Sequence, residues 1–186
     1  MTIRADSPYG FYPNQRVIQA NWYSLNCASF STYKNDMVRM TAGGQVALAN
    51  GGRRVPLLGA CQSFIDSDGV PLAYAASGST GVHVMVTDSP EQTYHAQEDH
   101  NATALHMLDR GNIGCLIRTH HGLNGNGVAR SEIDSSTFAA ATSGQFFLIQ
   151  EYSDDDQMSA LGFKRWIVRI SRHDTNVNVG RGPIGI

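Results

Sequence analysis

Histidines and carboxylates are the side chains of this 186-residue sequence with the clearest capacity for chemistry. The densest group is His95, Glu98, Asp99, His100 and His106. Zinc needs about four ligands that converge on one point, whereas only alternate residues of a strand share a face. No regular element would bring this group together, so a solvated turn beside a helix N-terminus is the simpler interpretation. We therefore expect no metal site and no cofactor.

Three other polar motifs invite the same question. His120 and His121 are adjacent, so their rings would point to opposite sides of a strand end, and an ion shared between chains at a symmetry axis is the remaining alternative. The run 154–156 is Asp-Asp-Asp, but the glycine-turned ligand series of a calcium loop does not follow it. The segment 66–69, Asp-Ser-Asp-Gly, is too short to enclose an ion and predicts a turn.

Catalytic motifs are equally sparse. The sequence has no Gly-x-Ser-x-Gly elbow, and its glycine pairs at 111–114 and 122–125 lack the Lys-Ser/Thr ending of a phosphate-binding loop. A metal-dependent barrel enzyme would need a compact His-x-His motif, which is missing. Facing carboxylates for sugar chemistry stay open, since a sequence does not show which of them meet. We expect a protein that is not an enzyme.

The composition indicates which kinds of partner the protein is not expected to bind. Only 16% of residues are charged, against about a quarter in typical globular proteins, and the net charge is -2. Without a basic run, direct nucleic-acid binding is not expected. The longest apolar stretches fall far below the roughly 20 residues that span a bilayer, and the first residues do not resemble a signal peptide. The chain is expected to be made in the cytoplasm, with Cys27, Cys61 and Cys115 reduced and mostly buried.

The elements that would position side chains are short strands. Apolar or alternating runs separated by Gly, Asn and Asp predict strands at 37–41, 45–49, 55–65, 82–87, 92–97, 113–119, 128–134, 145–152 and 163–172. Glycines at 43–44 and 51–52 favour hairpins and a meander. One short helix is predicted at 101–108. No repeat of 20–50 residues is present, which disfavours solenoids and propellers. The fold class is all-β, a single barrel or jelly-roll-like domain over 32–175.

Both ends differ from this domain. Residues 1–31 combine proline, glycine and asparagine with several aromatic residues, so this extended N-terminal arm must bury its rings on its own domain or on a neighbour. Residues 176–186, rich in glycine, predict a second extended arm. The candidate anchors of the N-terminal arm are Tyr9, Phe11, Tyr12, Pro13, Trp22 and Tyr23.

Three stretches resemble a family of virion proteins of tailed, cyanophage-like bacteriophages. Gly10-Phe-Tyr-Pro13 is similar to the Gly-Phe-x-Pro opening of that family. Residues 84–99, VMVTDSPEQTYHAQED, resemble its strand, Asp-x-Pro, strand and Gln-Glu-Asp pattern. Residues 132–137, EIDSST, are similar to its Leu-Asp-Ser-Ser-Thr, and 166–173 resemble its closing strand. The His-rich turn and the run 154–156 depart from the family pattern.

The resemblance implies a capsid cement, or decoration, protein. Such a protein is a viral structural protein with a β-barrel, which binds as a homotrimer to the outer surface of the major capsid protein shell. Its arms grip the shell and hold it against the pressure of packaged DNA, and its location is the virion. The alternatives are another virion part, at the head-tail junction or tail surface, and, less favoured, a β-barrel metal-dependent enzyme. Multivalent attachment and exchanged arms fit a mechanical role.

Overall fold

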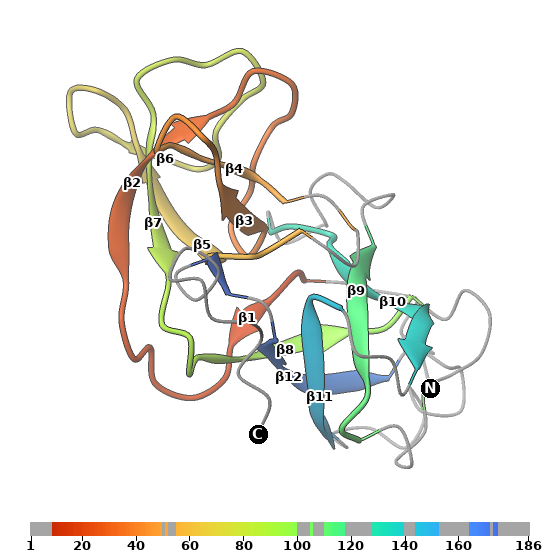
Figure 1. Cartoon of the computed structure of the whole chain (residues 1–186). Helices are drawn as coiled ribbons and strands as arrows, with labels where there is room; N and C mark the ends of the chain where they lie inside the picture. Colours follow the sequence, from red (N-terminus) through yellow and green to blue (C-terminus); the bar gives the residue numbers. More distant parts are fainter. Residues whose placement is uncertain are drawn as a thin grey trace, which may run out of the picture.

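A computed structural model describes residues 9–49, 51, 55–99, 105, 110–117, 128–139, 144–152, 164–171 and 173–174. Over these residues the chain forms strands in two sheets, which confirms the predicted all-β class (Figure 1). The strands are β1 (Tyr12–Pro13), β2 (Asn21–Asn26), β3 (Met37–Met40), β4 (Val46–Leu48), β5 (Gly59–Ile65), β6 (Pro71–Leu72), β7 (His83–Thr87), β8 (Thr93–Gln97), β9 (Ile113–Ile117), β10 (Glu132–Ala139), β11 (Phe146–Tyr152) and β12 (Arg165–Ile170). The predicted helix at 101–108 and the predicted C-terminal arm at 176–186 lie outside the described residues, apart from Leu105.

The first sheet closes on itself as a five-stranded barrel, which we call the first barrel. Strand β7 pairs with β2 and β5, β3 pairs with β5 and β4, and β4 closes the ring by pairing in parallel with β2. Strand β6 extends the sheet along β5. Aliphatic residues and two cysteines fill much of the interior, including Leu25, Val46, Cys61 and Val84. Closure removes most of the exposed strand edges that would otherwise invite pairing with other chains.

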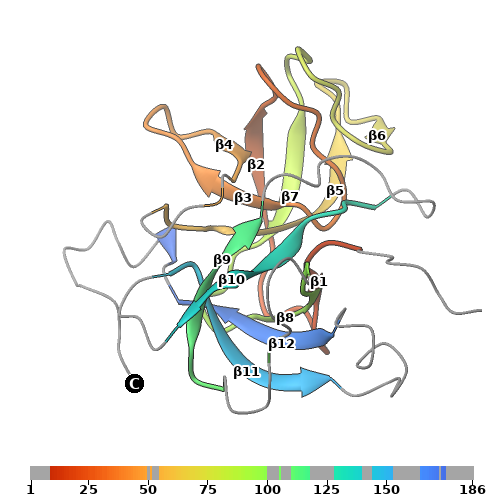
Figure 2. The same ribbon diagram turned by 90° about the vertical axis from the view of Figure 1, so that its right-hand side faces the viewer.

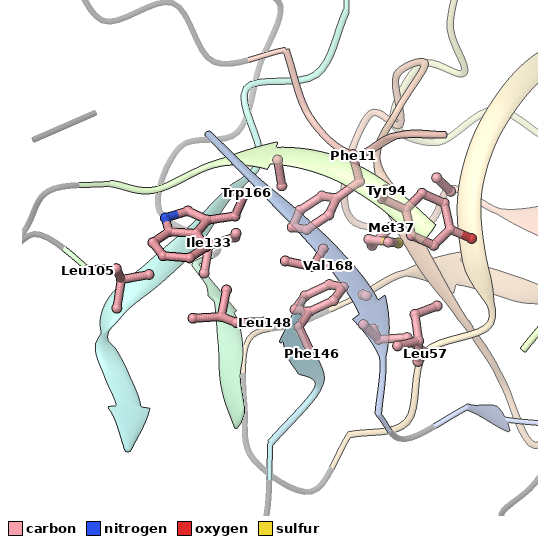
Figure 3. Close-up of a cluster of buried hydrophobic side chains, with 14 residues drawn as sticks. Phe11, Met37, Leu57, Tyr94, Leu105, Ile133, Phe146, Leu148, Trp166 and Val168 are labelled. Carbon is pink, nitrogen blue, oxygen red and sulfur yellow. The ribbon is translucent and has the colours of Figure 1, made fainter. Parts of the chain in front are cut away.

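The second sheet forms a second barrel from β8, β12, β11, β9 and β10 (Figure 2). All its neighbouring strands are antiparallel except at the seam, where a parallel bridge between Glu98 and Ile133 joins the end of β8 to β10. Strand β1 adds to the remaining edge of β8. Its interior is more aromatic than that of the first barrel, with Phe11, Tyr94 and Trp166 among its fully buried residues (Figure 3).

The two barrels share one pattern of connections. Around the first barrel the strands follow the order β2, β7, β5, β3, β4, and around the second the order β8, β12, β11, β9, β10. If the five strands of each barrel are numbered in chain order, both orders are first, fifth, fourth, second, third. In both rings the first and third strands are parallel, and the other neighbours are antiparallel. The fourth strand has a bulge at the same place, at Gln62 in β5 and Ile149 in β11. The chain therefore contains a structural repeat.

Strand register extends this correspondence to single residues. Leu25 faces Val46 in the first barrel, where Glu98 faces Ile133 in the second. By the same pairings, residues 21–24 of β2 correspond to 94–97 of β8, because both runs face corresponding residues of β7 and β12. The corresponding residues lie more than 50 positions apart, beyond the repeat length of solenoids and propellers.

Polar contacts join the two barrels. The Ser131 hydroxyl donates to the fully buried carboxyl group of Asp36 at 2.5 Å, and the Met40 N–H donates to Asp174 at 2.6 Å. Desolvation raises the pKa of Asp36 to about 6, against the opposing effect of its hydrogen bonds with Ser131 and the Tyr33 N–H. A fully buried carboxyl group is stable only when hydrogen-bonded, so this contact fixes how the barrels meet.

The structure differs from the sequence expectations in three ways. The predicted barrel-like character is confirmed, but the strands close into two barrels where one was predicted. The meander is interrupted, because β5 pairs with β3 and not with β4, although the predicted hairpin between β3 and β4 is confirmed. The strand predicted at 128–134 is observed at Glu132–Ala139. By contrast, one expectation is confirmed: alternation in 163–172 predicts that Trp166, Val168 and Ile170 share the apolar face of this strand, and all three side chains are buried in β12.

Candidate functional site

The N-terminal segment carries the candidate anchors, but it is not separate from the sheets. The sequence predicted an extended arm over 1–31, whereas the described part, 9–31, contributes β1 to the second sheet and β2 to the first barrel. Proline and glycine made this segment resemble a loop. Pro13 is accommodated because β1 is a two-residue edge strand, where one missing N–H costs no ladder bond.

Phe11 is a core residue of its own chain. Its side chain has no exposed surface and stacks on Phe146, with ring centroids 4.6 Å apart and planes 10° apart (Figure 3). Gly10 allows the chain before Phe11 to pass close to Asn35. Its φ is +70°, which suits glycine, and a Cβ at this position would lie 2.6 Å from the Asn35 carbonyl oxygen. The Phe11 N–H donates to that carbonyl at 2.8 Å. Phe11 therefore anchors the segment internally, as does buried Pro13.

Tyr12 points the other way. Strand alternation turns its side chain outward between Phe11 and Pro13, and it is 52% exposed. The backbone beneath it is fixed, since the Asn14 N–H donates to the Thr93 carbonyl at 2.8 Å. Tyr12 is thus an exposed ring on an ordered backbone.

Tyr9 lies partly buried at the start of the same segment. The guanidinium carbon of Arg165 lies 5.1 Å from the centroid of its ring, which is a cation–π arrangement. Like Phe11 and Pro13, Tyr9 therefore makes its contact within the chain.

Trp22 and Tyr23 are separated by the same alternation in β2. Trp22 is 48% exposed, whereas Tyr23 packs against the first-barrel core. The Tyr23 hydroxyl donates to buried Asp88, which also accepts the Asn21 side-chain amide at 2.7 Å. Burial, followed by the bond with Asp88, raises the pKa of Tyr23. The tyrosine is held in place as a donor, and the tryptophan remains available to a partner.

Exposed apolar side chains concentrate in this part of the chain. Among the described residues, the large hydrophobic side chains that are exposed are Tyr12, Val17, Ile18, Trp22, Phe30, Val70 and Tyr74. We call the first five, from residues 12–30, the N-terminal apolar set. Val17, Ile18 and Phe30 were not among the predicted anchors. The pair Val17-Ile18 stands between polar residues without a strand pattern, so only its hydrophobicity signalled it.

The predicted histidine and carboxylate group is only partly described. His95 lies in β8 and is partly buried, while His100 and His106 lie outside the described residues, as do His120, His121 and 154–156. Asp99 is buried and accepts the N–H and hydroxyl of Ser135 at 2.9 and 2.8 Å. Within the described parts of the chain, no three His, Cys, Asp or Glu residues are grouped so as to hold a metal ion.

Glu98 has a different environment from any that the sequence indicated. It has no exposed surface and accepts the backbone N–H of Leu105 at 3.0 Å and of Lys164 at 3.4 Å, and the Trp166 indole N–H at 3.2 Å. Desolvation raises the pKa of Glu98 to about 7, although these donors and the charge of Lys164 favour ionisation. The carboxyl group titrates near neutral pH while it is enclosed by protein.

Two further predictions can be checked directly. The segment 66–69 is a turn, as expected, in which Asp66 accepts the N–H of Asp68 at 2.9 Å and of Val70 at 2.8 Å. Cys27, Cys61 and Cys115 are buried thiols that form no disulfide, also as expected.

Two further findings concern the membrane and known proteins. No helix in the described part of the chain is long and apolar enough to cross a membrane. Family models, curated proteins and solved structures were compared with the chain, and none of the three comparisons finds a match.

Proposed function

We propose that this protein is a capsid cement protein that binds the outer surface of the major capsid protein shell of a tailed bacteriophage. It acts as a homotrimer, is not an enzyme, and stabilises the shell mechanically against internal DNA pressure. The proposal rests on the resemblance of three stretches of the sequence to such proteins and on the character of the exposed surface.

The observation that carries the proposal is the N-terminal apolar set. Most of the large hydrophobic side chains exposed in the described residues come from the short segment 12–30. Exposed aromatic and aliphatic side chains are the groups that protein-binding surfaces use. Tryptophan and tyrosine, here Trp22 and Tyr12, are the residue types most enriched at the energetic centres of interfaces.

The backbone of this segment favours tight binding. Phe11 and β1 fix one end in the second barrel, and β2 fixes the other in the first. Between them, the Ile18 N–H donates to Gln92 at 3.0 Å. A surface that is ordered before it meets its partner loses little conformational entropy on binding. The same surface repeated in a trimer would multiply modest contacts into strong attachment.

The experiment is a binding assay with empty shells assembled from the major capsid protein encoded in the same genome. The wild-type protein should be a trimer by mass photometry, should co-sediment with shells and should raise their rupture temperature. A double variant, Tyr12→Ser with Trp22→Ser, should lose co-sedimentation. The matched control is Val70→Ser with Tyr74→Ser, because these side chains are similarly exposed but lie outside the segment.

Point variants are preferable to deletion of residues 1–20, which would also remove Phe11 from the core. Wild-type protein that ignores shells would contradict the cement function. Binding to isolated tails instead would indicate another part of the virion.

A further inference from the structure

The repeat reveals a difference between corresponding strand edges. In the second barrel, β1 covers the edge of β8, with Tyr12 opposite His95 and Pro13 opposite Tyr94. The residues of β2 that correspond to His95 and Tyr94 are Trp22 and Asn21. Among the described residues, no strand pairs with β2 on this side before Leu25, where β4 begins. The edge that is filled in the second barrel is open in the first.

The backbone groups of Trp22 point toward this open side. The Leu25 N–H donates to the Val82 carbonyl at 2.9 Å, so Leu25 and every second residue before it turn their backbone groups toward β7. Those of Trp22 therefore point away from β7. The same alternation holds in β8, where the Glu98 N–H donates to Lys164 at 2.9 Å and His95 turns toward β1.

The surroundings of the edge suit an incoming strand. Figure 1 shows β2 on the outer margin of the first barrel, with no described ribbon beyond it. The Trp22 side chain is 48% exposed, although its backbone lies in an ordered barrel. An unpaired N–H and C=O beside an exposed aromatic ring is the arrangement that binds peptides by strand addition.

We propose that the edge of β2 at residues 20–22 docks an extended strand of the shell protein, antiparallel to β2. The second barrel shows the chemistry of such a strand, since β1 binds the corresponding edge with two residues, one outward aromatic and one proline. The incoming strand pairs with the backbone of Trp22 and places an apolar side chain beside its indole. That the strand comes from the shell rests on the proposed function, whereas the open edge does not.

Trp22→Pro is the decisive variant. Proline removes the outward N–H and keeps the inward pairing of β2, because Trp22 makes no ladder bond with β7. Trp22→Thr is its matched control. It removes the indole but keeps the backbone N–H, and threonine, like tryptophan, favours strands. Amide exchange of the isolated wild-type protein provides a direct check, in which the Trp22 N–H should exchange at least about 100-fold faster than that of His95.

The first binding probe is a fluorescent peptide with the sequence of residues 10–16, which reproduces β1. We expect anisotropy to show binding to the wild type, binding weakened about tenfold or less by Trp22→Thr, and no binding to Trp22→Pro. No binding to the wild type at millimolar concentration, equal binding by the two variants, or a slowly exchanging Trp22 N–H in the monomer would overturn the open edge. Protection that appears only with self-association would assign the edge to a second copy and contradict the proposal.

The second probe is the empty shell. If wild type and Trp22→Thr co-sediment with shells and Trp22→Pro does not, the shell strand is the occupant. If Trp22→Pro binds shells as well as Trp22→Thr does, that occupant is excluded while the cement function stands. If the peptide binds but shells do not bind the wild type, the cement function and the shell strand fail together, and the open edge alone is retained.

Discussion

The two barrels share connections, register and the position of a bulge, yet their interiors are filled differently. In the first barrel, the first strand supplies the large residue of one facing pair, Tyr23, and the fifth strand supplies Val84. In the second barrel the sizes are exchanged, with Ala96 facing Trp166. Total volume at the position is roughly kept although neither residue is, and cores tolerate such exchanges. Backbone pairing, more than side-chain identity, defines this fold.

The polar ends of the two large residues follow the same logic. Tyr23 donates to Asp88 and Trp166 donates to Glu98. A buried tyrosine or tryptophan needs a partner for its O–H or N–H, and each barrel provides a carboxyl group. In the second barrel this carboxyl group belongs to Glu98, which lies at the parallel bridge between the end of β8 and β10. The corresponding residue of the first barrel is Leu25. Glu98 therefore gives the second barrel a titratable group at a position where the first barrel has the non-titrating Leu25.

The largest expected effect tests the dependence of the second barrel on the N-terminal segment. Phe11→Ala should lower the free energy of unfolding by about 3–5 kcal/mol, because it empties a fully buried ring site stacked on Phe146. Urea unfolding followed by tryptophan fluorescence would measure the loss. A change below about 1 kcal/mol would mean that Phe11 is not part of the core.

The next effect concerns Glu98 and the difference in pH response. Its pKa is about 7 in the folded chain and near 4.5 when unfolded, so the neutral form favours folding. The associated stability is complete below pH 4.5 and is lost as pH rises through about 7, a decline on the order of 3 kcal/mol. Glu98→Gln should flatten this part of the stability profile measured by urea unfolding at successive pH values.

Asp36 and Asp174 provide the internal control for that experiment. Burial raises the pKa of both carboxyl groups, so they act in the same direction, and they are present in wild type and variant alike. Only the difference between the two profiles belongs to Glu98. Parallel profiles for wild type and Glu98→Gln would show that Glu98 does not titrate in this range.

A smaller effect addresses the joint between the barrels. Ser131→Ala removes a donor from buried Asp36 and should cost about 1–3 kcal/mol, since the carboxyl group loses a partner that water cannot replace. A double-mutant cycle with Asp36→Asn would isolate the coupling between the two residues. If the two losses simply add, the hydrogen bond does not couple the barrels.

The smallest effect is expected at the exposed tryptophan. Trp22→Ala should lower the free energy of unfolding by no more than about 1 kcal/mol, because the side chain is half exposed and the pairing of β2 with β7 is kept. Thermal unfolding compared with Phe11→Ala would place the two aromatic residues at opposite ends of the scale. Equal losses would contradict the division between internal anchors and exposed residues.

The sequence predicted local features better than distant pairings. The face of β12 and the hairpin between β3 and β4 followed from alternation and glycine positions, which act over a few residues. The pairing of β1 with β8 joins residues 12 and 95, and no local pattern specifies such a partner. Proline in β1 concealed a strand that is possible only at a sheet edge.

The candidate site was only partly predictable for a similar reason. Hydrophobicity identified the aromatic residues of the N-terminal segment. It did not show that Phe11 is buried while the adjacent Tyr12 is exposed, because this difference depends on the tertiary structure. The repeat was concealed because corresponding residues such as Leu25 and Glu98 share no chemistry. Register carries the similarity, and register is not visible in a single sequence.

The ends of the described chain are exchanged between the halves, and this has a consequence for synthesis on the ribosome. Phe11 stacks on Phe146, while Leu57 of the first half pairs with His173. At ~5–20 residues per second, the roughly 135 residues from Phe11 to Phe146 take about 7–27 seconds to be made. The apolar N-terminal segment therefore leaves the ribosome before its buried partners have been made. Neither half can complete its core and strand pairing until the last described strands have left the ribosomal tunnel.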